Sequence, residues 1–576
     1  MAVNSDILFP TSRKEMDLLG WDYADIILFS GDAFIDHPSF GTAVIARVLE
    51  NEGYKVAIIP QPNWRDDLRD FKKLGEPRLF FGVNAGVMDS MINHYTANKR
   101  LRSNDAYTPD GASGRRPDYA VTVYSQILKK LYPHIPVVIG GVEASLRRFT
   151  HYDYWQDKIK PSVLIDSGAD WLVYGMGEKP VIELAAAIAS YTPVHQIRKI
   201  PQIAYITSEP LNDRKEIIEL KSYEECLKNK MALAENFRII EQESNVYYPK
   251  HLTEPVSGKF VQVNPPYPVA EVGEIDAYYD LPYSRKPHPR YKDKHIPAYE
   301  MIKFSINTHR GCFGSCSFCT ISAHQGKFVQ SRSEESILKE AGKVASMDNF
   351  KGYISDLGGP SANMYKMQGI NTDLCSKCKR ESCIYPAICK NLEISHNPLL
   401  NLYEKISAVK GIKKAFVGSG IRYDLFLGEK GYLNESGKRY LKEVIVNHTS
   451  GRFKVAPEHT QEHVLKSMGK PSFILFQNLK QEFDSIIIKE GLKYQIVPYF
   501  ISSHPGCTMD DMKSLAQNPY LKDIRLEQVQ DFTPTPLTRS SIIFYTGVDP
   551  KTLKTIFVEK NPEMKLKQKS FFLNKK

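Results

Sequence analysis

The residues best suited to chemistry in this sequence are three cysteines within eight positions: Cys312, Cys316 and Cys319. An odd set this tight cannot pair internally as disulfides without strain or a leftover thiol. Three thiolates can hold three irons of a [4Fe–4S] cluster and leave the fourth iron open to a small chelating molecule. Gly311 and Gly314 would allow the turns needed to wrap thiolates around a cluster. The spacing favours a cluster, and the alternative is a structural zinc site completed by His309 or His324.

Four further cysteines form a second group in the stretch NTDLCSKCKRESCIYPAIC: Cys375, Cys378, Cys383 and Cys389. Four thiolates are a closed set, sufficient for a tetrahedral zinc ion or for a second, fully ligated [4Fe–4S] cluster. The surrounding lysines and Arg380 favour thiolates. We expect a bound metal here, and spacing does not separate zinc from iron–sulfur. The remaining cysteines, Cys226 and Cys507, are expected to be structural thiols.

Composition indicates an ordinary soluble globular protein, with 42% hydrophobic and 25% charged residues among 576. Since no run of about 18 apolar residues occurs, no membrane contact is expected. The first residues lack a secretory signal. We therefore expect a cytoplasmic protein, in which clustered cysteines more often bind metal than form disulfides.

The net charge of +10 is unevenly distributed. The segment from Lys551 onward holds eight lysines against two glutamates, and residues 283–295 interleave tyrosines with arginine and lysine. Either segment could contact RNA phosphates and stack on bases. A solvated tail and a charged linker are the favoured interpretation.

The pattern of short apolar runs and helical periodicity predicts an α/β protein with several domains. Residues 1–192 alternate strands and helices, which is typical of an open parallel sheet. The strands expected there are 24–30, 56–62, 78–83, 136–141 and 170–175. Ligands bind such sheets at the carboxyl ends of the strands, where the turns carry Gly, Asp, His and Glu. Residues 193–298 are expected to form a helical segment, with one long helix at 213–243, and a Pro/Tyr-rich connector.

Residues 299–540 return to the strand–helix pattern. Six strands alternating with helices predict a partial (β/α)6 barrel, with function at the carboxyl ends of its strands. The expected strands are 301–307, 351–359, 413–420, 452–458, 494–503 and 526–532. The first cysteine group follows the first strand, and residues 371–396 form a cysteine-rich insertion at the same end. Residues 541–576 are the basic C-terminal tail.

The cysteine loop resembles that of the radical S-adenosylmethionine (SAM) superfamily, since C-x3-C-x-aromatic-C, with Phe318 as the aromatic residue, follows the first strand of a six-fold βα pattern. The stretch DLGGP is similar to the superfamily's Gly-Gly-Glu stretch, which implies backbone contacts from Gly358 and Gly359 to the methionine amino group. VGSGIRYDL places Ser419 and Arg422 where the superfamily touches the ribose and carboxylate.

Two later stretches, VAPEHTQEHVLKSMGK with Glu458 and ISSHPGCTMDDM, resemble motifs of methylthiotransferase-like members. Cys507 stands where those members carry a glutamate. The whole chain is most similar to the uncharacterised YgiQ-like family. The stretches that carry this resemblance are DHPSFG (36–41), IGGVEASLRRFTHYDYWQD (139–157), HRGCFGSCSFC (309–319) and QVQDFTPTP (528–536).

The resemblance implies an enzyme that cleaves SAM reductively at a [4Fe–4S] cluster and starts radical chemistry on an unknown substrate. It implies a one-electron reductant of the flavodoxin or ferredoxin type. RNA modification is slightly favoured over a small molecule or peptide, on the barrel motifs and the basic tail. The rival hypothesis is a non-catalytic iron–sulfur or zinc protein that binds nucleic acid.

The resemblance also implies an N-terminal domain like a cobalamin-binding module, whose Asp-x-His-x-x-Gly fingerprint would supply a histidine to cobalt. The nearest match runs from Asp36-His37 to Gly41, with Asp and His adjacent and Gly one place too far. We therefore do not expect cobalamin. The domain is expected to be a cobalamin-domain-like scaffold that binds substrate or covers the barrel.

Overall fold

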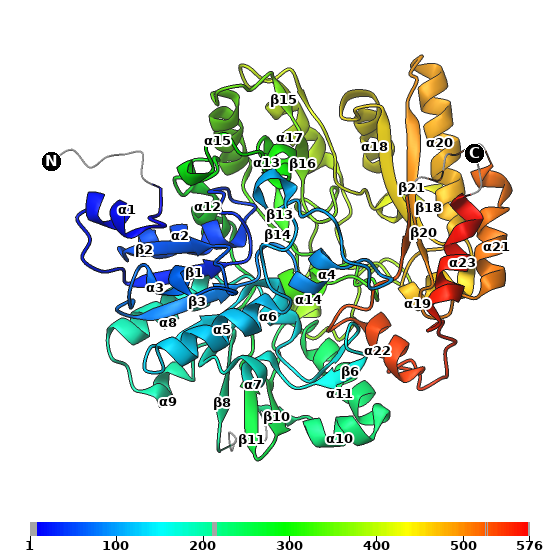
Figure 1. Cartoon of the computed structure of the whole chain (residues 1–576). Helices are drawn as coiled ribbons and strands as arrows, with labels where there is room; N and C mark the ends of the chain where they lie inside the picture. Colours follow the sequence, from blue (N-terminus) through cyan, green and yellow to red (C-terminus); the bar gives the residue numbers. More distant parts are fainter. Residues whose placement is uncertain (1–7, 210–215, 523, 525, 527, 574–576) are drawn as a thin grey trace.

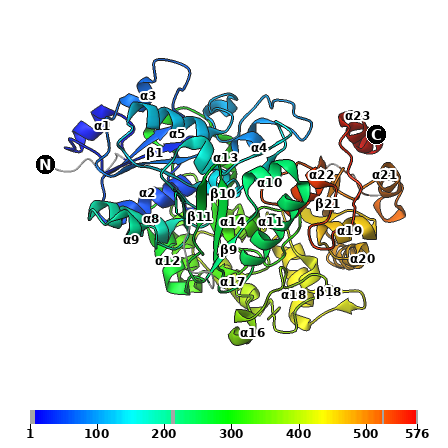
Figure 2. The ribbon, with the colours of Figure 1, turned by 90° about the horizontal axis from the view of Figure 1, so that it is seen from below.

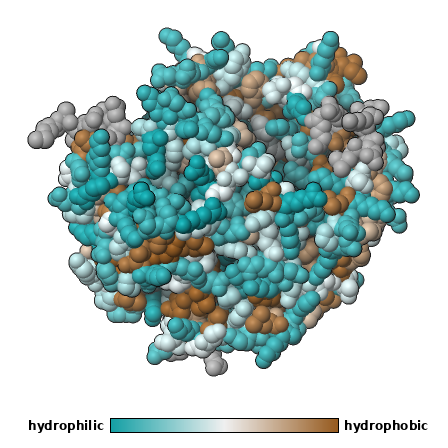
Figure 3. All heavy atoms as spheres, in the orientation of Figure 1, coloured by the Kyte–Doolittle hydropathy of each residue, from teal (hydrophilic) through white to brown (hydrophobic). Residues whose placement is uncertain are grey.

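The computed structural model describes residues 8–209, 216–522, 524, 526 and 528–573 (Figure 1). No helix within these residues combines the length and apolar character needed to cross a bilayer. On the face shown in Figure 3, hydrophobic side chains gather in separate small groups between hydrophilic ones.

A nine-stranded mixed sheet dominates the N-terminal half, with the order β2-β1-β3-β4-β7-β8-β11-β10-β9. Its first five strands are parallel. They are β1 (Ile26–Ser30), β2 (Val56–Pro60), β3 (Phe80–Asn84), β4 (Val137–Ile139) and β7 (Trp171–Val173). Nearly every residue of these strands is buried, as expected for a parallel sheet covered on both faces. All five strands were predicted from their apolar runs.

Helices cover both faces of this sheet (Figure 2). Because side chains alternate along a strand, Ile27 and Phe29 pack into one hydrophobic core and Ile26 and Leu28 into another. The first core is closed by α5 (Ala120–Leu131) and α7 (Val163–Ser167), and the second by α2 (Gly41–Asn51) and α8 (Glu178–Ala189).

The sheet continues beyond the predicted boundary at residue 192, which corrects the expectation of a purely helical segment. Its added strands are β8 (Ile203–Thr207), β9 (Ile217–Glu219), β10 (His251–Val256) and β11 (Lys259–Val263). The long helix expected at 213–243 is wrong as well, since α10 (Tyr223–Lys228) and α11 (Lys230–Glu243) are separate. Asn229 separates them because its side chain caps α11 by accepting from the Met231 amide.

The C-terminal half alternates short parallel strands with helices around one hydrophobic core, as the pattern predicted. The parallel strands are β12 (Ser305–Asn307) with β16 (Asp356–Gly358), β15 (Tyr353–Ile354) with β17 (Lys414–Ala415), and β20 (Arg452–Glu458), β21 (Gln495–Ser502) and β22 (Gln528–Asp531) in one sheet. The main helices are α15 (Glu334–Ala345), α17 (Asn397–Ser407), α18 (Glu435–Asn447), α19 (Glu462–Met468), α20 (Phe473–Lys489) and α21 (Met509–Ala516).

The C-terminal segment is partly folded onto the rest of the chain, so the expectation of a solvated tail is wrong for its last helix, whereas Lys554 and Lys560 ahead of that helix are exposed. Helix α22 (Arg539–Thr546) contacts α11, and α23 (Pro562–Leu573) packs against α21 and β22, beside which it lies in Figure 1. Lys565 and Gln568 on α23 are buried. The lysines of this segment predicted exposure, but its contacts with α21 and β22 bury one face of α23.

The basic stretch 283–295 is packed in part. Arg285 is buried, forms an ion pair with Glu340 and donates to the Ser305 carbonyl at 2.6 Å. His288 is buried too, whereas Lys286, Lys292 and Lys294 are exposed. The interpretation of this stretch as a solvated charged linker is therefore wrong for Arg285 and His288 alone.

Candidate functional site at the cysteine loop

The first three cysteines lie on one loop between β13 (His309–Arg310) and α14 (Ile321–Gln325). Gly311 opens the loop with φ +83°, and a Cβ there would lie 2.4 Å from the Phe328 carbonyl oxygen, so only glycine fits. Cys312 is buried, whereas Cys316 and Cys319 are half-buried. The loop therefore presents its thiols at the edge of the protein interior.

Arg422 lies against this loop. Its Nη1 is 3.2 Å from Cys316 Sγ, while Nε and Nη2 donate to both carboxylate oxygens of Asp424 at 2.9 and 2.6 Å. Burial raises the pKa of Cys312, and the Arg422 charge opposes that rise. Burial would lower the pKa of Arg422, but Asp424 and the nearby thiols raise it well above its usual value. A permanent cation thus faces the thiols.

Glu458 completes a polar group beside Cys319. It forms a buried ion pair with Lys470 at 3.6 Å. Burial raises the pKa of Glu458, and Lys470 opposes the rise. Burial also raises the pKa of Cys319 to about 12, with smaller contributions from neighbouring thiols and from Glu458. Two buried cations and two buried carboxylates therefore lie next to the cysteine loop.

The glycine pair expected to contact a ligand lies at the end of β16. The Gly358 carbonyl accepts from the Thr308 amide at 2.8 Å. A Cβ on Gly359 would lie 2.5 Å from His309 Cε1, so the backbone here approaches the ring closely. Ser419 Oγ donates to Asp356, whose carboxylate also accepts from the Gly418 amide at 2.8 Å. In this arrangement Ser419 braces the turn.

Phe318 belongs to the packing behind the loop. Its ring meets the buried His504 edge-on, with the centroids 6.0 Å apart. His504 Nε2 lies 2.7 Å from Ser540 Oγ, which donates to Ser317 Oγ at 2.7 Å. This chain anchors the cysteine loop to the C-terminal segment. It was missed from the sequence because Ser317 and Ser540 are 223 residues apart.

Among the described residues, no three His, Cys, Asp or Glu side chains converge on a position for a single metal ion. The zinc site considered for His309 or His324 therefore has no support. His309 is buried, and burial lowers its pKa to about 4. Neighbouring thiols nevertheless raise the pKa values of Cys312 and Cys319, after the larger effect of burial. The three thiols of the loop therefore influence one another.

The cysteine-rich insertion closes at its neck and contacts the first loop. Gly369 and Leu392 form an antiparallel bridge at the neck. The Cys383 amide and Ser382 Oγ both donate to the Phe313 carbonyl at 3.1 Å. The two cysteine groups are therefore neighbours in space.

Two cavities border α14. The first, here the sheet-edge cavity, has a volume of about 430 Å³ and lies between the carboxyl ends of the parallel strands and the cysteine loop. Its lining includes Ile45 and Val181, on α2 and α8, together with Asn84, the last residue of β3, and His309, the first residue of β13. His309 Nε2 is buried without a hydrogen-bond partner among the described residues. This is the end of the sheet at which a ligand was expected.

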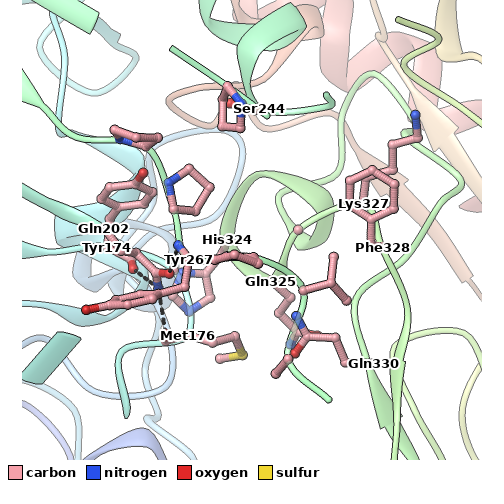
Figure 4. A pocket seen from close by; sticks show the side chains of 18 of the residues that line it. Tyr174, Met176, Gln202, Ser244, Tyr267, His324, Gln325, Lys327, Phe328 and Gln330 are labelled. Carbon is pink, nitrogen blue, oxygen red and sulfur yellow. Dashed lines mark hydrogen bonds between the residues drawn. The ribbon is translucent and has the colours of Figure 1, made fainter. Parts of the chain in front are cut away.

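The second, here the connector cavity, measures about 170 Å³ (Figure 4). Gln202 supports one wall by donating from Nε2 to the carbonyls of Tyr174 and Met176 at 2.8 and 2.6 Å. His324 and Gln325 line both cavities, so α14 is a shared wall. This cavity was not predicted, because its residues come from distant segments.

The other expected positions are structural. His37 is fully buried, and its Nδ1 accepts from the Ser39 amide at 3.0 Å. Burial and Arg285 hold its pKa well below the usual range, and His37 is not among the residues lining the sheet-edge cavity. Cys226 and Cys507 are fully buried, and burial raises both pKa values to about 12, as expected of structural thiols.

Comparison with known proteins places the chain in a family. The radical SAM N-terminal family matches residues 8–305. A UPF0313 protein of Bacteroides thetaiotaomicron is 57% identical over 98% of this chain and 93% of its own. The UPF0313 protein YgiQ of Escherichia coli K12 is 42% identical over 94% of this chain and 79% of its own.

Among solved structures, the radical SAM methyltransferase TsrM of Kitasatospora setae, with cobalamin and a [4Fe–4S] cluster bound, shares the fold with a TM-score of 0.50 and 15% identity. The match covers 90% of this chain and 77% of that one. The chain belongs to the UPF0313 (YgiQ) family of the radical SAM superfamily.

Proposed function

We propose that this protein is a radical SAM enzyme whose catalytic [4Fe–4S] cluster is held by Cys312, Cys316 and Cys319. The observation that carries the proposal is the arrangement of these thiols on one loop, with Arg422 donating to Cys316. We further propose that residues 299–540 form the partial radical SAM barrel and that residues 1–192 form a cobalamin-domain-like unit. The sheet built by β8 to β11 extends that unit toward residue 263.

The bound cluster would supply one electron to SAM and produce a 5′-deoxyadenosyl radical, as in the superfamily. The chain's own residues prepare this step. Arg422, fixed by Asp424, offsets the negative charge of the thiolates. Gly359 lets the backbone approach His309 where a side chain would not fit. The buried Cys312 and the half-buried Phe318 limit the access of water to the loop. Glu458 and Lys470 offer groups for the SAM ammonium and carboxylate.

The test is anaerobic reconstitution followed by SAM and dithionite, with 5′-deoxyadenosine measured by chromatography. We expect 5′-deoxyadenosine, an EPR signal of the reduced cluster that changes when SAM is added, and loss of both in Cys312→Ala. Cys226→Ala is the matched control, because that thiol is buried far along the chain from the loop. A fully loaded cluster that produces neither effect would instead support the non-catalytic, nucleic-acid-binding alternative.

In the cell, a flavodoxin- or ferredoxin-type protein would serve as the one-electron reductant. The substrate class is open among RNA, a peptide and a small molecule. The basic tail gives RNA less support than its sequence suggested, because Lys565 is buried and Lys551 pairs with Glu241 and Glu381. Substrate should enter by the sheet-edge cavity, which lies between the N-terminal sheet and the cysteine loop.

Besides the substrate, a corrinoid is the second candidate ligand for the sheet-edge cavity. This candidate replaces our expectation from the sequence that the protein does not bind cobalamin. The cavity runs from the strand ends between the sheet and α2 and α8, and the fold is shared with a cobalamin-bound protein. His37 would not be its axial ligand, since that ring faces the interior. Protein produced with cobalamin and then desalted should show a corrinoid absorbance spectrum, and Ile45→Trp, which fills part of the cavity, should lose it. A colourless protein that still cleaves SAM would eliminate this candidate alone.

A further inference from the structure

The cysteine-rich insertion and the first cysteine loop donate hydrogen bonds to each other. Its Ser382 Oγ and Cys383 amide donate to the Phe313 carbonyl, and Ser315 Oγ of the first loop donates back to the Glu381 carbonyl at 2.6 Å. Cys312 and Phe313 share a hydrophobic cluster with Ile384 and Leu392 of the insertion. The second group of thiols is therefore held by the fold and is not on a loose loop.

A buried ammonium group lies beside these thiols. Lys327 is only 2% exposed, and its Nζ donates to the main-chain carbonyls of Asn245 and Arg380. Both acceptors are neutral carbonyls, and among the described residues Lys327 forms no ion pair with a carboxylate. Carrying an unpaired charge into the interior is costly, so a buried ammonium implies a negative group nearby.

The thiols of the insertion are the nearest candidates for the missing negative charge. Arg380, whose carbonyl accepts from Lys327 Nζ, lies between Cys378 and Cys383 on the insertion. The Cys389 amide donates to the Cys383 carbonyl at 2.7 Å and the Cys378 amide to the Cys375 carbonyl at 3.1 Å, so the four cysteines form two hydrogen-bonded pairs. When bound to metal, four such thiolates would carry the negative charge that Lys327 lacks.

Hydrogen-bond donors already point at two of the sulfurs. Asn391 Nδ2 lies 3.3 Å from Cys375 Sγ, and the Arg380 amide lies 3.4 Å from Cys378 Sγ. Amide donors to sulfur are typical of the surroundings of metal-bound thiolates, which they orient and whose potential they tune. Four sulfurs around one zinc ion would meet at a single point about 2.3 Å from each, and no such point exists among the described residues.

We propose that Cys375, Cys378, Cys383 and Cys389 hold an auxiliary [4Fe–4S] cluster and that Lys327 is its buried countercharge. A cube holds its four ligand sulfurs farther apart than a single ion does. The site is fully ligated by protein, so it does not bind SAM. The inference does not depend on the proposed radical reaction, because it rests on the insertion and Lys327 alone.

The first experiment removes the catalytic site and asks what remains. The variant Cys312→Ala/Cys316→Ala/Cys319→Ala, anaerobically reconstituted, should keep about four irons and four sulfides per chain, with an EPR signal that SAM does not change. The reciprocal variant Cys375→Ser/Cys383→Ser should also keep about four irons, with a signal that SAM does change. Absence of iron from the first variant, or one zinc in its place, would overturn the auxiliary cluster. Loss of the SAM effect in the second variant would count against the proposed function instead.

The second experiment tests the countercharge. Lys327→Met should shift the midpoint potential of the auxiliary cluster to a more negative value, because a nearby cation stabilises the more negative, reduced form. Lys327→Arg should restore most of the potential, and it remains informative if Lys327→Met folds poorly. Lys379→Met is the matched control, since Lys379 is exposed on the same insertion. Equal potentials for wild type, Lys327→Met and the control would refute the role of Lys327.

Discussion

The guanidinium of Arg422 links a loop thiol to a buried carboxylate: Nη1 lies 3.2 Å from Cys316 Sγ, and Nε lies 2.9 Å from Asp424. Arg422 and Cys316 are 106 positions apart in the sequence, so their contact exists only in the folded chain. Arg422 cannot turn away from the thiol without breaking the bidentate contact with Asp424. The arginine is thereby a fixed positive charge at the cysteine loop.

Arg422→Met should slow the formation of 5′-deoxyadenosine by about 10–100-fold, the range typical when an outer partner of a metal ligand is lost. It should also destabilise the fold by about 3–5 kcal/mol, because Asp424 is left buried and unpaired. Activity assays and urea unfolding measure the two effects. The double variant Arg422→Met/Asp424→Asn should recover stability but not activity.

The control for this prediction is Arg439→Met, since Arg439 is exposed on α18. It should leave both quantities unchanged. If the double variant recovered full SAM cleavage, Arg422 would matter only as the partner of Asp424, and its contact with Cys316 would have no catalytic meaning.

Gly359→Ala should weaken SAM binding while the iron content stays constant. The added methyl group would lie 2.5 Å from His309 Cε1, so the ring or the backbone must shift, at a cost of about 1–3 kcal/mol. Gly342→Ala, on the exposed side of α15, is the matched control, because a Cβ there meets no atom within 4 Å. Equilibrium binding of SAM to the two variants measures the difference. Equal affinities would show that the backbone at Gly359 is not part of the SAM site.

Local patterns predicted local structure well. Apolar runs such as ADIILFS give β1 because a strand covered on both faces needs no polar alternation. The cysteine spacing identified the loop because its members lie within eight residues. The resemblance to the radical SAM superfamily indicated Arg422 and Glu458, and the structure places both beside the loop.

Contacts between distant segments could not be predicted in this way. Lys327 follows Cys319 by eight residues, yet its contacts are with Asn245 and Arg380, which are distant in the sequence. The lysines of α23 suggested that this helix is exposed to solvent. The sequence does not show that the Lys565 ammonium contacts the hydroxyl of Tyr154, which lies 411 positions earlier. The strands β8 to β11 were missed because they complete an edge of a sheet formed by earlier residues.

Gln568 should contribute measurably to stability through the C-terminal helix. Its Oε1 accepts from both the amide and the hydroxyl of Ser503 at 3.0 Å, and all of these groups are buried. Gln568→Leu leaves two buried donors without an acceptor and should lower the free energy of unfolding by about 1–3 kcal/mol. Urea unfolding measures it, and Lys567→Met, on the exposed side of α23, should have no effect. An unaffected Gln568→Leu would show that α23 is not docked in solution.

Lys565 should make the stability of the protein depend on pH above neutrality. Burial lowers its pKa to about 8, and its Nζ lies 3.0 Å from the Tyr154 hydroxyl. Between about pH 8 and its ordinary value near 10.4, the unfolded chain binds a proton that the folded chain does not. Stability therefore rises with pH in this window as the cost of burying the charge disappears, by up to about 3 kcal/mol from this group.

Lys565→Met isolates this contribution, because other groups titrate in the same range. The difference in unfolding free energy between Lys565→Met and wild type should favour the variant at pH 7 and shrink as the pH approaches 10.4. Asp531 and Glu559 raise the pKa of Lys565 and Lys99 lowers it, so the variant is compared at constant ionic strength. Lys567→Met, whose ammonium is exposed, should show a difference that does not change with pH. A constant difference for Lys565→Met as well would mean that Lys565 is solvated in the folded protein and that the C-terminal helix is docked in another way.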